Sequence, residues 1–480
     1  MAPGEVEAEG PPGILGPGQG VLSDRTAVPH APGRLVATGV PAFRGGRATL
    51  ALATLRLARQ ALPSDARVAL ELAGRLASQR SAARNGTPLA RVVIADADAL
   101  GRLLWPPTPD ALGEAFLRGD IDIEGDIAAA IDTGRAMDLR RLSADELRRL
   151  LRWGTRLRRG SGSVARLTRV ARMRGRRHSR VRDLAAVRFH YDVGNDFYGL
   201  WLDRRLTYSC AYFESTADPA QALDAAQEAK LDLICRKLRL APGRRLLDIG
   251  CGWGSLALFA AERYAVEATG TTLSEPQVSY AEARARREGL GDRARVELRD
   301  YRDLANPGSF DAVASVGMFE HVGRANLPVY FAAAFAALRP GGLFLNHGIA
   351  TAAHARWRPV GLRFRDGGFV GRYVFPDGEL VTVEDAIAQA RAAGFELLDA
   401  QSLRPHYALT LEAWVRRLEA SAEQARRLAG DEAYRTWRLC MAAARRGFET
   451  GALDVVQLLL ARPATRGSAP RPLRPWWAQP

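Results

Sequence analysis

From about residue 185 onward, short apolar runs follow segments whose apolar residues have helical spacing. The runs cover residues 246–249, 265–270, 295–298, 310–316 and 342–345. Strands that alternate with helices in this way are typical of a parallel sheet with helices on both faces. The pattern therefore predicts an α/β fold with a doubly wound, Rossmann-like sheet. Residues 380–462 are expected to add mostly helices to it.

The region before this one contains a smaller unit with a mixed pattern. Residues 92–94 predict a short strand, 96–104 a helix, and 121–123 an edge strand after a turn. In front of them, residues 47–80 alternate Ala and Leu with Arg in a helical manner. We therefore expect a small α+β domain over 46–140, and the α/β domain over 185–462.

The two ends of the chain have a different composition from these domains. Residues 1–34 contain 13 Gly or Pro residues and no hydrophobic period, which predicts a disordered tail over 1–45. Residues 463–480 are rich in Pro and Arg and predict a second, flexible tail.

A basic segment over 141–184 joins the two predicted domains. Ser143 and Glu146 have the spacing of a capping box, in which each side chain satisfies a free amide at a helix start. Leucines then fall on one face, and residues 148–182 contain 14 arginines and no Asp or Glu. The segment is either a solvated linker or an amphipathic helix on anionic lipid head groups. Nucleic acid is a weaker alternative, because Trp153 is the one aromatic residue of this stretch.

The composition points to a basic protein without a membrane span. The formal net charge is +15, and 66 of the 68 basic residues are arginines, a skew that fits a GC-rich coding bias. Excess positive charge favours polyanions such as an anionic membrane surface. No apolar run reaches the length of a spanning helix, and no secretory signal is recognisable. Four cysteines without metal-ligand spacing predict no metal site and a reducing cytoplasm.

The glycine turn after the first predicted strand suggests a nucleotide-like cofactor. It reads L-L-D-I-G-C-G-W-G over 246–254, with Gly250, Gly252 and Gly254 allowing close backbone approach. The spacing does not match the dinucleotide pattern G-x-G-x-x-G. Asp248 suits the ammonium group of S-adenosylmethionine. The next strand ends at 270–273, including Thr272 and Leu273, without the acid that usually binds ribose; Thr272 and Gln277 are candidates for that role.

Further motifs follow the same order along the chain. They are H-Y-D-V-G-N-D-F-Y (190–198), T-Y-S-C-A-Y-F (207–213), D-Y-R-D-L (300–304), S-V-G-M-F-E-H-V-G (315–323), L-F-L-N-H-G-I (343–349), Y-V-F-P-D-G (373–378) and H-Y-A-L-T-L-E-A-W (406–414). Together with the glycine turn they resemble the cyclopropane-fatty-acid synthase family, which includes the mycolic acid cyclopropane synthases. Residues 112–127 resemble the small N-terminal domain of the bacterial phospholipid enzymes.

The resemblance implies a class I methyltransferase fold and a specific reaction. A cis double bond of an acyl chain attacks the methyl of S-adenosylmethionine, and the resulting carbocation loses a proton from that methyl and closes a ring. In this family a bound bicarbonate is thought to be the base. Its cage would be formed by Cys210 and Ile349, through backbone groups, and by the side chains of Glu320, His347 and Tyr407. Aromatic and apolar walls would shield the cation from water.

The resemblance also assigns cofactor contacts. Tyr208 and Ser209 would contact the amino acid end of S-adenosylmethionine, and Tyr301 and Arg302 would flank the adenine. His190 and Tyr191 form either part of a lid or a plain helix start. Many members carry a cysteine at the position of Ala444, so a covalent role for that cysteine is not supported in this chain.

The sequence thus predicts a cytoplasmic enzyme, peripherally bound to the inner face of the membrane, that cyclopropanates unsaturated phospholipid acyl chains. The N-terminal domain would contact lipid or form a homodimer. One alternative keeps the cofactor but yields methyl- or methylene-branched chains, or uses a specialised lipid or natural product. Another is a basic membrane- or nucleic-acid-binding protein with an inactive methyltransferase fold; no nucleic-acid partner is expected.

Overall fold

The computed structural model describes residues 45–76, 87–104, 108–159, 166–304, 307–351, 368–464 and 473–478. The tail predicted over 1–45 lies outside this part, apart from Gly45. No helix in the described ranges is long and apolar enough to cross a bilayer.

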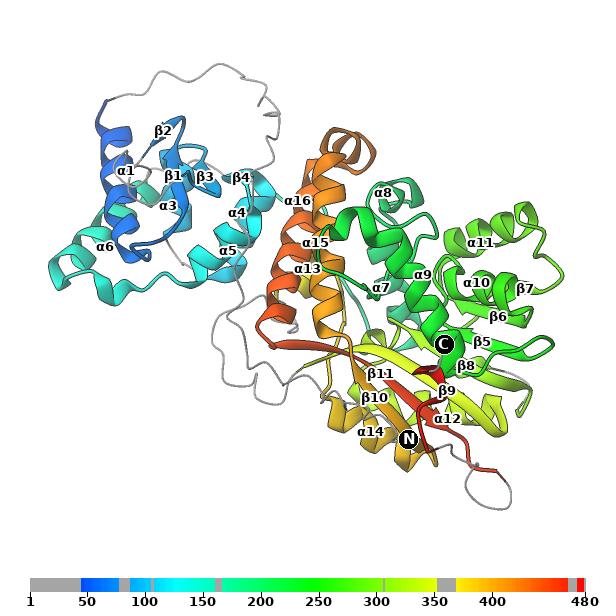
Figure 1. The fold of residues 1–480 in the computed structure, drawn as a ribbon. Helices are drawn as coiled ribbons and strands as arrows, with labels where there is room; N and C mark the ends of the chain where they lie inside the picture. The colour runs from blue at the N-terminus through cyan, green and yellow to red at the C-terminus, as the bar shows by residue number, and fades with distance from the viewer. Residues whose placement is uncertain are drawn as a thin grey trace, which may run out of the picture. The chain divides into compact units, whose positions relative to one another are not determined.

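The first sheet has four strands in the order β2-β1-β3-β4 (Figure 1). The strands are β1 (Val68–Leu72), β2 (Arg75–Leu76), β3 (Ala90–Ile94) and β4 (Ile121–Gly125). β3 and the edge strand β4 confirm two sequence predictions. The helical prediction over 47–80 is wrong beyond Ala58, where α1 (Gly45–Ala58) ends. Val68 and Leu72 are instead buried in β1, which pairs with β2 and β3.

The other helices of this region are α3 (Ala97–Leu103), α4 (Pro109–Arg118), α5 (Ile127–Arg135) and α6 (Ala144–Arg159). The capping box before α6 is present: Ser143 N donates to Glu146 Oε2 at 2.8 Å, and Glu146 N donates to Ser143 Oγ at 3.3 Å. Leu157 of α6 is fully buried beside α3, where a Cβ at Gly101 would lie 2.7 Å from its carbonyl carbon. The apolar face of α6 therefore packs inside the protein, while most of its arginines remain exposed.

The second sheet has seven strands in the order β10-β11-β9-β8-β5-β6-β7. The parallel strands are β5 (Arg245–Ile249), β6 (Glu267–Thr272), β7 (Ala294–Leu298), β8 (Phe310–Val316) and β9 (Leu338–Thr351). β11 (Leu453–Ala461) pairs antiparallel with β9, and the edge strand β10 (Glu396–Ser402) pairs antiparallel with β11. The predicted doubly wound α/β sheet is confirmed. The helical prediction over 380–462 missed β10 and β11, because a buried apolar run such as β11 has no period that separates strand from helix.

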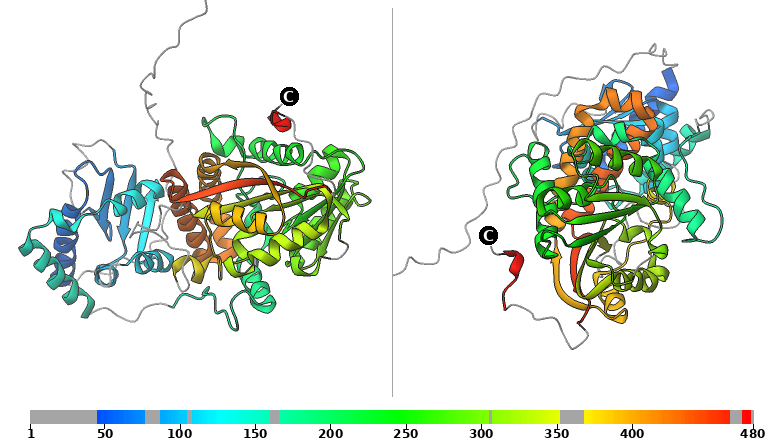
Figure 2. Two further views of the ribbon diagram at one scale, coloured as in Figure 1. Left: turned by 90° about the horizontal axis from the view of Figure 1, so that it is seen from below. Right: turned by 90° about the vertical axis from the view of Figure 1, so that its right-hand side faces the viewer.

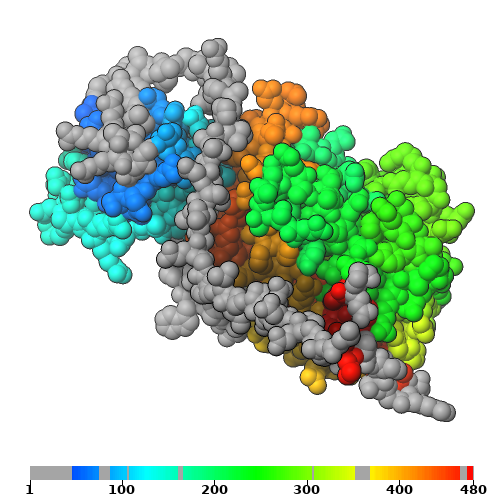
Figure 3. All heavy atoms as spheres, in the orientation of Figure 1, coloured from blue at the N-terminus to red at the C-terminus, as the bar shows by residue number. Residues whose placement is uncertain are grey.

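Helices cover both faces of this sheet (Figures 1 and 2). The helices α9 (Pro219–Lys237), α10 (Ser255–Tyr264) and α11 (Glu275–Arg287) cover one face, and α12 (Leu327–Ala337) and α14 (Val383–Ala392) the other. Leu246 packs with the first layer and Leu247 with the second, since successive residues of a strand point to opposite faces. In the space-filling view, the green helices around α9 form the surface over the strands (Figure 3).

A further group of helices packs near the carboxyl ends of the parallel strands. They are α7 (Arg180–Tyr191), α8 (Asn195–Gly199), α13 (Phe369–Tyr373), α15 (Arg404–Ala420) and α16 (Ala422–Glu449). α16 contains a break at Gly430, whose φ of 83° is not helical. These helices supply most of the aromatic residues described below.

The described part of the C-terminal segment is attached to α9, in contrast to the flexible tail expected over 463–480. Trp476 Nε1 donates to the carbonyls of Arg236 and Lys237 at 3.1 and 3.2 Å. The Arg239 guanidinium lies 3.8 Å from the centroid of the Trp476 ring. The helix C-terminus thus gains donors for its free carbonyls.

Candidate functional site

The glycine turn after β5 has the conformation that its sequence predicts. Gly250, Gly252 and Gly254 have φ of 74°, 55° and 78°, a region that favours glycine. A Cβ at Gly250 would lie 2.6 Å from Met318 Cβ, whereas one at Gly252 would meet nothing within 4 Å. The first glycine therefore allows packing, and the second leaves the backbone open to a pocket.

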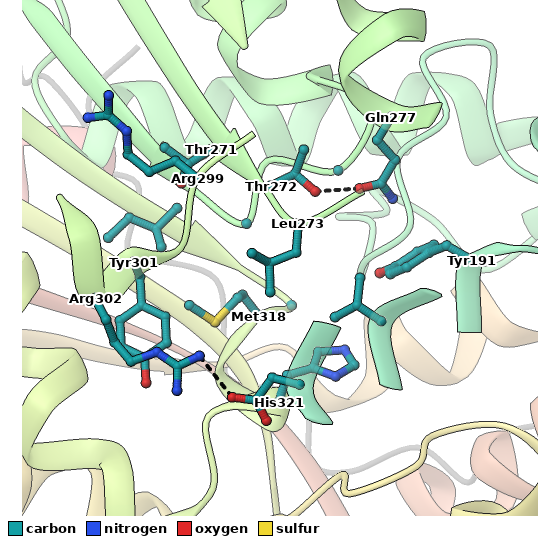
Figure 4. A pocket seen from close by; sticks show the side chains of 16 residues that line it. Tyr191, Thr271, Thr272, Leu273, Gln277, Arg299, Tyr301, Arg302, Met318 and His321 are labelled. Carbon is teal, nitrogen blue, oxygen red and sulfur yellow. Dashed lines mark hydrogen bonds and ion pairs between the residues drawn. The ribbon is translucent and has the colours of Figure 1, made fainter. Parts of the chain in front are cut away.

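That pocket lies at the carboxyl ends of β5, β6 and β7 and has an empty volume of about 670 Å³, including the part open to solvent. Its lining residues that the sequence predicted are Gly250, Gly252, Thr272, Leu273, Gln277, Tyr301 and Arg302. In Figure 4, Tyr191 and Gln277 lie on one side and Tyr301 and Arg302 on the other. Sequence reasoning missed Asp183 and Val187, which lie outside the motifs, and Met318, which lies within the motif at 315–323 but was given no role there. We call this site the cofactor pocket.

Thr272 and Gln277 are fixed to each other in this pocket. Thr272 Oγ1 donates to Gln277 Oε1 at 2.7 Å (Figure 4). Gln277 Nε2 is buried and has no hydrogen-bond partner among the described residues. The pair therefore offers an amide donor where other nucleotide-binding folds place an acid.

Tyr301 and Arg302 both line the pocket, but they differ in whether their polar groups already have partners in the protein. Arg302 pairs with Asp300 at 2.6 Å and with Asp183 of α7 at 3.0 Å. Hydrogen bonding to Asp300 raises the pKa of Arg302 further, so its charge is committed to these partners. Tyr301 Oη is buried and has no partner in the described ranges. Tyr301 is thus the better placed of the two to meet a ligand.

Four of the predicted cofactor residues do not line the pocket: Tyr208, Ser209, Asp248 and Gly254. Asp248 is buried at the end of β5, and burial raises its pKa to about 7 against the opposing effect of Lys230. Ser209 Oγ accepts a hydrogen bond from Lys230 Nζ at 3.0 Å. Gly254 opens α10 with a φ that favours glycine.

Tyr208 belongs to a group of aromatic rings beside the glycine turn, which we call the aromatic cluster. Its members are His190, Tyr191, Tyr198, Trp201, Tyr208, Trp253, Trp414 and Trp437. The Tyr208 ring lies 5.2 Å from that of Trp414 and 5.6 Å from that of His190, measured between centroids. Tyr191 lines the cofactor pocket as well, so the cluster and the pocket adjoin.

Glu320 is the acid next to this cluster. It follows β8 in a short 3-10 helix, is buried, and accepts a hydrogen bond from Ile349 N at 2.7 Å through Oε1. Its Oε2 has no hydrogen-bond partner among the described residues. Burial raises the pKa of Glu320 to about 7, and the bond from Ile349 opposes this shift. Such a carboxyl can exchange a proton near neutral pH.

His347 lies two residues before Ile349 on β9, so both residues belong to the same face of that strand. Gln457 of β11 is its register partner, and Gln457 Nε2 is 3.3 Å from His347 Nδ1. With the amide assigned this way, Nδ1 accepts and Nε2 carries the hydrogen. His347 Nε2 has no partner within the described residues. Burial lowers the pKa of His347 to about 3, with Lys230 and Lys237 adding to the shift, so the ring is neutral.

Tyr407 and Cys210 complete the residues predicted for this centre. Burial raises the pKa of Tyr407 well above its usual value, and electrostatic interaction with the ionised forms of Glu320 and Cys210 acts in the same direction. Cys210 Sγ donates to the carbonyls of Ala211 and Leu403 at 3.2 and 3.7 Å, and burial raises its pKa. We call Glu320, His347, Ile349, Cys210 and Tyr407 the Glu320 centre. Gln457 and Lys230, beside it, were not predicted.

Comparison with known proteins identifies the family. A profile described as mycolic acid cyclopropane synthetase matches residues 178–458, which is more than half of the chain. The chain belongs to the cyclopropane synthase family. A probable fatty acid methyltransferase of Pseudomonas putida is 42% identical over 383 residues, which cover 79% of this chain and 89% of the relative.

Two further family members support the assignment. The cyclopropane-fatty-acyl-phospholipid synthase of Escherichia coli K12 is 42% identical over 232 residues, 48% of this chain and 56% of the relative. The crystal structure of mycolic acid cyclopropane synthase CmaA1 complexed with SAH and CTAB matches with a TM-score of 0.54 at 35% identity, over 58% of this chain and 98% of that one. The predicted family and class I methyltransferase fold are thus confirmed. The protein is an S-adenosylmethionine-dependent methyltransferase of the cyclopropane synthase family.

Proposed function

We propose that this cyclopropane synthase adds a methylene from S-adenosylmethionine to the cis double bond of unsaturated acyl chains in membrane phospholipids. The observation that carries the proposal is the buried Glu320 carboxyl of the Glu320 centre, whose Oε2 has no hydrogen-bond partner among the described residues and which lies beside the aromatic cluster and the cofactor pocket. The phospholipid synthase of Escherichia coli supports the choice of substrate.

The cofactor pocket would hold the nucleoside end of S-adenosylmethionine. Among the described residues that line the pocket, Gln277 Nε2 and Tyr301 Oη are buried without a hydrogen-bond partner and would meet the ligand. Asp248 and Ser209 would face the amino acid end, as an acid and a hydroxyl suit a zwitterion. When bound, the cofactor supplies an electrophilic methyl on a sulfonium sulfur.

The aromatic cluster would shield the carbocation that forms on the acyl chain. Ring faces stabilise positive charge, and the buried rings exclude water that would quench it. Trp253 belongs to the glycine turn, and the rings of Tyr198 and Tyr191 lie 5.0 and 5.6 Å from its ring, measured between centroids. The cluster therefore stands where the cofactor and the acyl chain would meet.

A bound bicarbonate would be the base that takes the proton from the new methyl. Glu320 would hold the protonated oxygen of this ion through Oε2, which has no hydrogen-bond partner among the described residues, and help carry the proton away, while Ile349 N holds Oε1 in place. His347 Nε2 would donate a hydrogen bond to the ion. The Ile349 amide, expected to help hold this ion, is engaged by Glu320 here.

The exposed arginines of α6 would hold the enzyme against anionic lipid. Arg149, Arg152 and Arg156 are exposed on this helix, and each basic residue near such a surface contributes about 1 kcal/mol. The rate on vesicles should then fall when neutral lipid replaces anionic lipid. An unchanged rate would contradict binding of the α6 arginines to an anionic membrane surface.

The similarity to a probable fatty acid methyltransferase favours a branched acyl chain as a second candidate product. If the cation loses its proton from another position, or takes up a hydride from a separate hydride donor, the same centre yields a methylene- or methyl-branched chain. Product analysis separates these outcomes.

The proposal is tested by Glu320→Gln. Gln keeps the shape and the bond from Ile349 but cannot take up the proton, so turnover should fall about 100-fold or more. The Kd for S-adenosylmethionine, measured by calorimetry, should stay unchanged. Glu379→Gln is the control, since Glu379 N bonds the Glu320 carbonyl but its carboxylate accepts from Arg324 N. Near-normal turnover of the Glu320 variant would overturn the assignment.

A further inference from the structure

The two lysines of this chain stand on one helix and are both buried. Every other basic side chain of the 68 is an arginine. Lys230 is 1% exposed and Lys237 is fully buried, and both belong to α9, two turns apart. An ammonium is smaller than a guanidinium and binds as a point charge. The two buried positions on α9 therefore carry lysine, whereas every other basic position of the chain carries arginine.

Lys237 has a complete structural explanation. Its Nζ donates to Asp399 Oδ2 at 3.0 Å and to Gln401 Oε1 at 2.7 Å, both on β10. The lysine therefore attaches α9 to the edge of the sheet. No ligand is needed to account for its charge.

Lys230 lacks such a partner. Its Nζ donates to Ser209 Oγ at 3.0 Å, and within the part of the chain that the structure describes it forms no ion pair. The carboxylates of Asp203 and Asp248 act on it through space. An ammonium has three donors, and the described residues take up one of them, so Lys230 keeps donor capacity for another group.

The bond to Ser209 fixes the direction of that hydroxyl. An ammonium has donors only, so Ser209 Oγ must accept from it and its own hydrogen must point to another acceptor. Gln227 Nε2 donates to the carbonyls of Ser209 and Thr207 at 2.8 and 3.2 Å, which holds the loop in place. Ser209 is thus a fixed donor backed by a positive charge.

Asp248 provides the opposite character nearby. It is 2% exposed, its carboxylate interacts with Lys230 through space, and it ends the strand that leads into the glycine turn. Lys230 with the Ser209 hydroxyl suits a negative group, and Asp248 suits a positive group. Together they suit a ligand that carries both charges. The α-amino acid end of S-adenosylmethionine is such a ligand.

We propose that Lys230 binds the carboxylate of the cofactor's amino acid end electrostatically and orients the Ser209 hydroxyl toward it, while Asp248 takes the ammonium. This inference rests on the cofactor of the proposed function and deepens it. Lys230 is a positioning residue, because it acts largely through Ser209.

The test compares S-adenosylhomocysteine with its decarboxylated analogue, which keeps the amine but lacks the carboxylate. Calorimetry gives the Kd of both ligands for the wild type, Lys230→Met and Lys237→Met. The wild type should prefer S-adenosylhomocysteine by about 100-fold, as a charge-assisted contact is lost in the analogue. Lys230→Met should reduce this preference to about threefold, and Lys237→Met should keep it.

Several results would overturn the inference. Equal weakening of both ligands by Lys230→Met would show a structural role. If Lys230→Met keeps the preference for S-adenosylhomocysteine but its turnover is activated less by added bicarbonate, Lys230 acts on the Glu320 centre and not on the cofactor. If Lys230→Met does not fold, Ser209→Ala replaces it and should lower the preference about tenfold; an unchanged preference would contradict the inference. A wild type that binds neither ligand would instead refute the cofactor assignment.

Discussion

The cofactor pocket and the Glu320 centre adjoin each other but are built in different ways. The pocket opens to solvent, and much of its wall is formed by the glycine turn and by residues that follow β6. The residues of the Glu320 centre come from β9, α15, the segment after β8 and the segment between α8 and α9, and most of them are buried. The pocket thus depends on local turns, and the centre on long-range packing.

The polar groups of the two regions differ in what they can do. Both regions hold buried atoms without a hydrogen-bond partner among the described residues. In the pocket these are the amide Nε2 of Gln277 and the hydroxyl of Tyr301, which can hydrogen-bond to a ligand. In the centre they belong to Glu320, whose pKa burial raises to about 7, and to His347, so this region can also move a proton. Changes in the pocket should therefore alter cofactor affinity, and changes in the centre should alter turnover.

The largest expected effect on this comparison is the pH dependence of turnover. Burial raises the pKa of Glu320 to about 7, so the carboxylate that accepts the proton is lost as the pH falls through 7. At saturating cofactor and lipid, kcat should drop about tenfold for each pH unit below 7. His347, with a pKa of about 3, stays neutral over this range. A flat profile from pH 8 to 5 would contradict the role of Glu320.

Next in size is the loss of Gln457. Gln457→Leu removes the amide that holds the His347 tautomer, and kcat should fall about tenfold, as expected for one buried hydrogen bond. The Kd for S-adenosylmethionine should not change. Gln457→Glu should be worse, because a carboxylate takes the hydrogen on Nδ1 and leaves Nε2 without one. Equal activity of the three proteins would rule out the tautomer argument.

The smallest effect is expected in the pocket. Thr272→Val removes the bond to Gln277, so the Kd for S-adenosylmethionine should rise about threefold to tenfold while kcat at saturation is kept. Thr269→Val is the control on the same strand, since Thr269 accepts from Arg295 and does not line the pocket. If Thr272→Val lowers kcat and leaves the Kd unchanged, the pocket affects turnover as the Glu320 centre does, which would contradict the proposed difference between the two regions.

This difference also explains what the sequence could predict. The glycines, Thr272 and Gln277 lie within 28 residues of one another, and their spacing with β5 and β6 was enough to predict the pocket. The Glu320 centre was expected only from the resemblance to a family. Gln457 was missed because it meets His347 through the pairing of β11 with β9, and β11 itself was read as helical.

Lys230 was missed for a different reason. No motif marks it, and its proposed role depends on Ser209, which lies 21 residues earlier in the chain, before α9 begins. The available signal was compositional: an isolated lysine in a chain that otherwise uses arginine. The sequence predicts the aromatic cluster even less well than Lys230, because its rings come from separate segments of the chain and meet only after folding.

The central claim is that the Glu320 centre removes a proton from the newly added methyl and so forms a ring. The direct measurement is mass spectrometry of the fatty acids released after the purified protein has acted on S-adenosylmethionine and vesicles of a cis-monounsaturated anionic phospholipid. We predict an acyl chain one methylene heavier that carries a cyclopropane ring. A methyl-branched or exomethylene product, formed at a comparable rate, would contradict this account of the Glu320 centre.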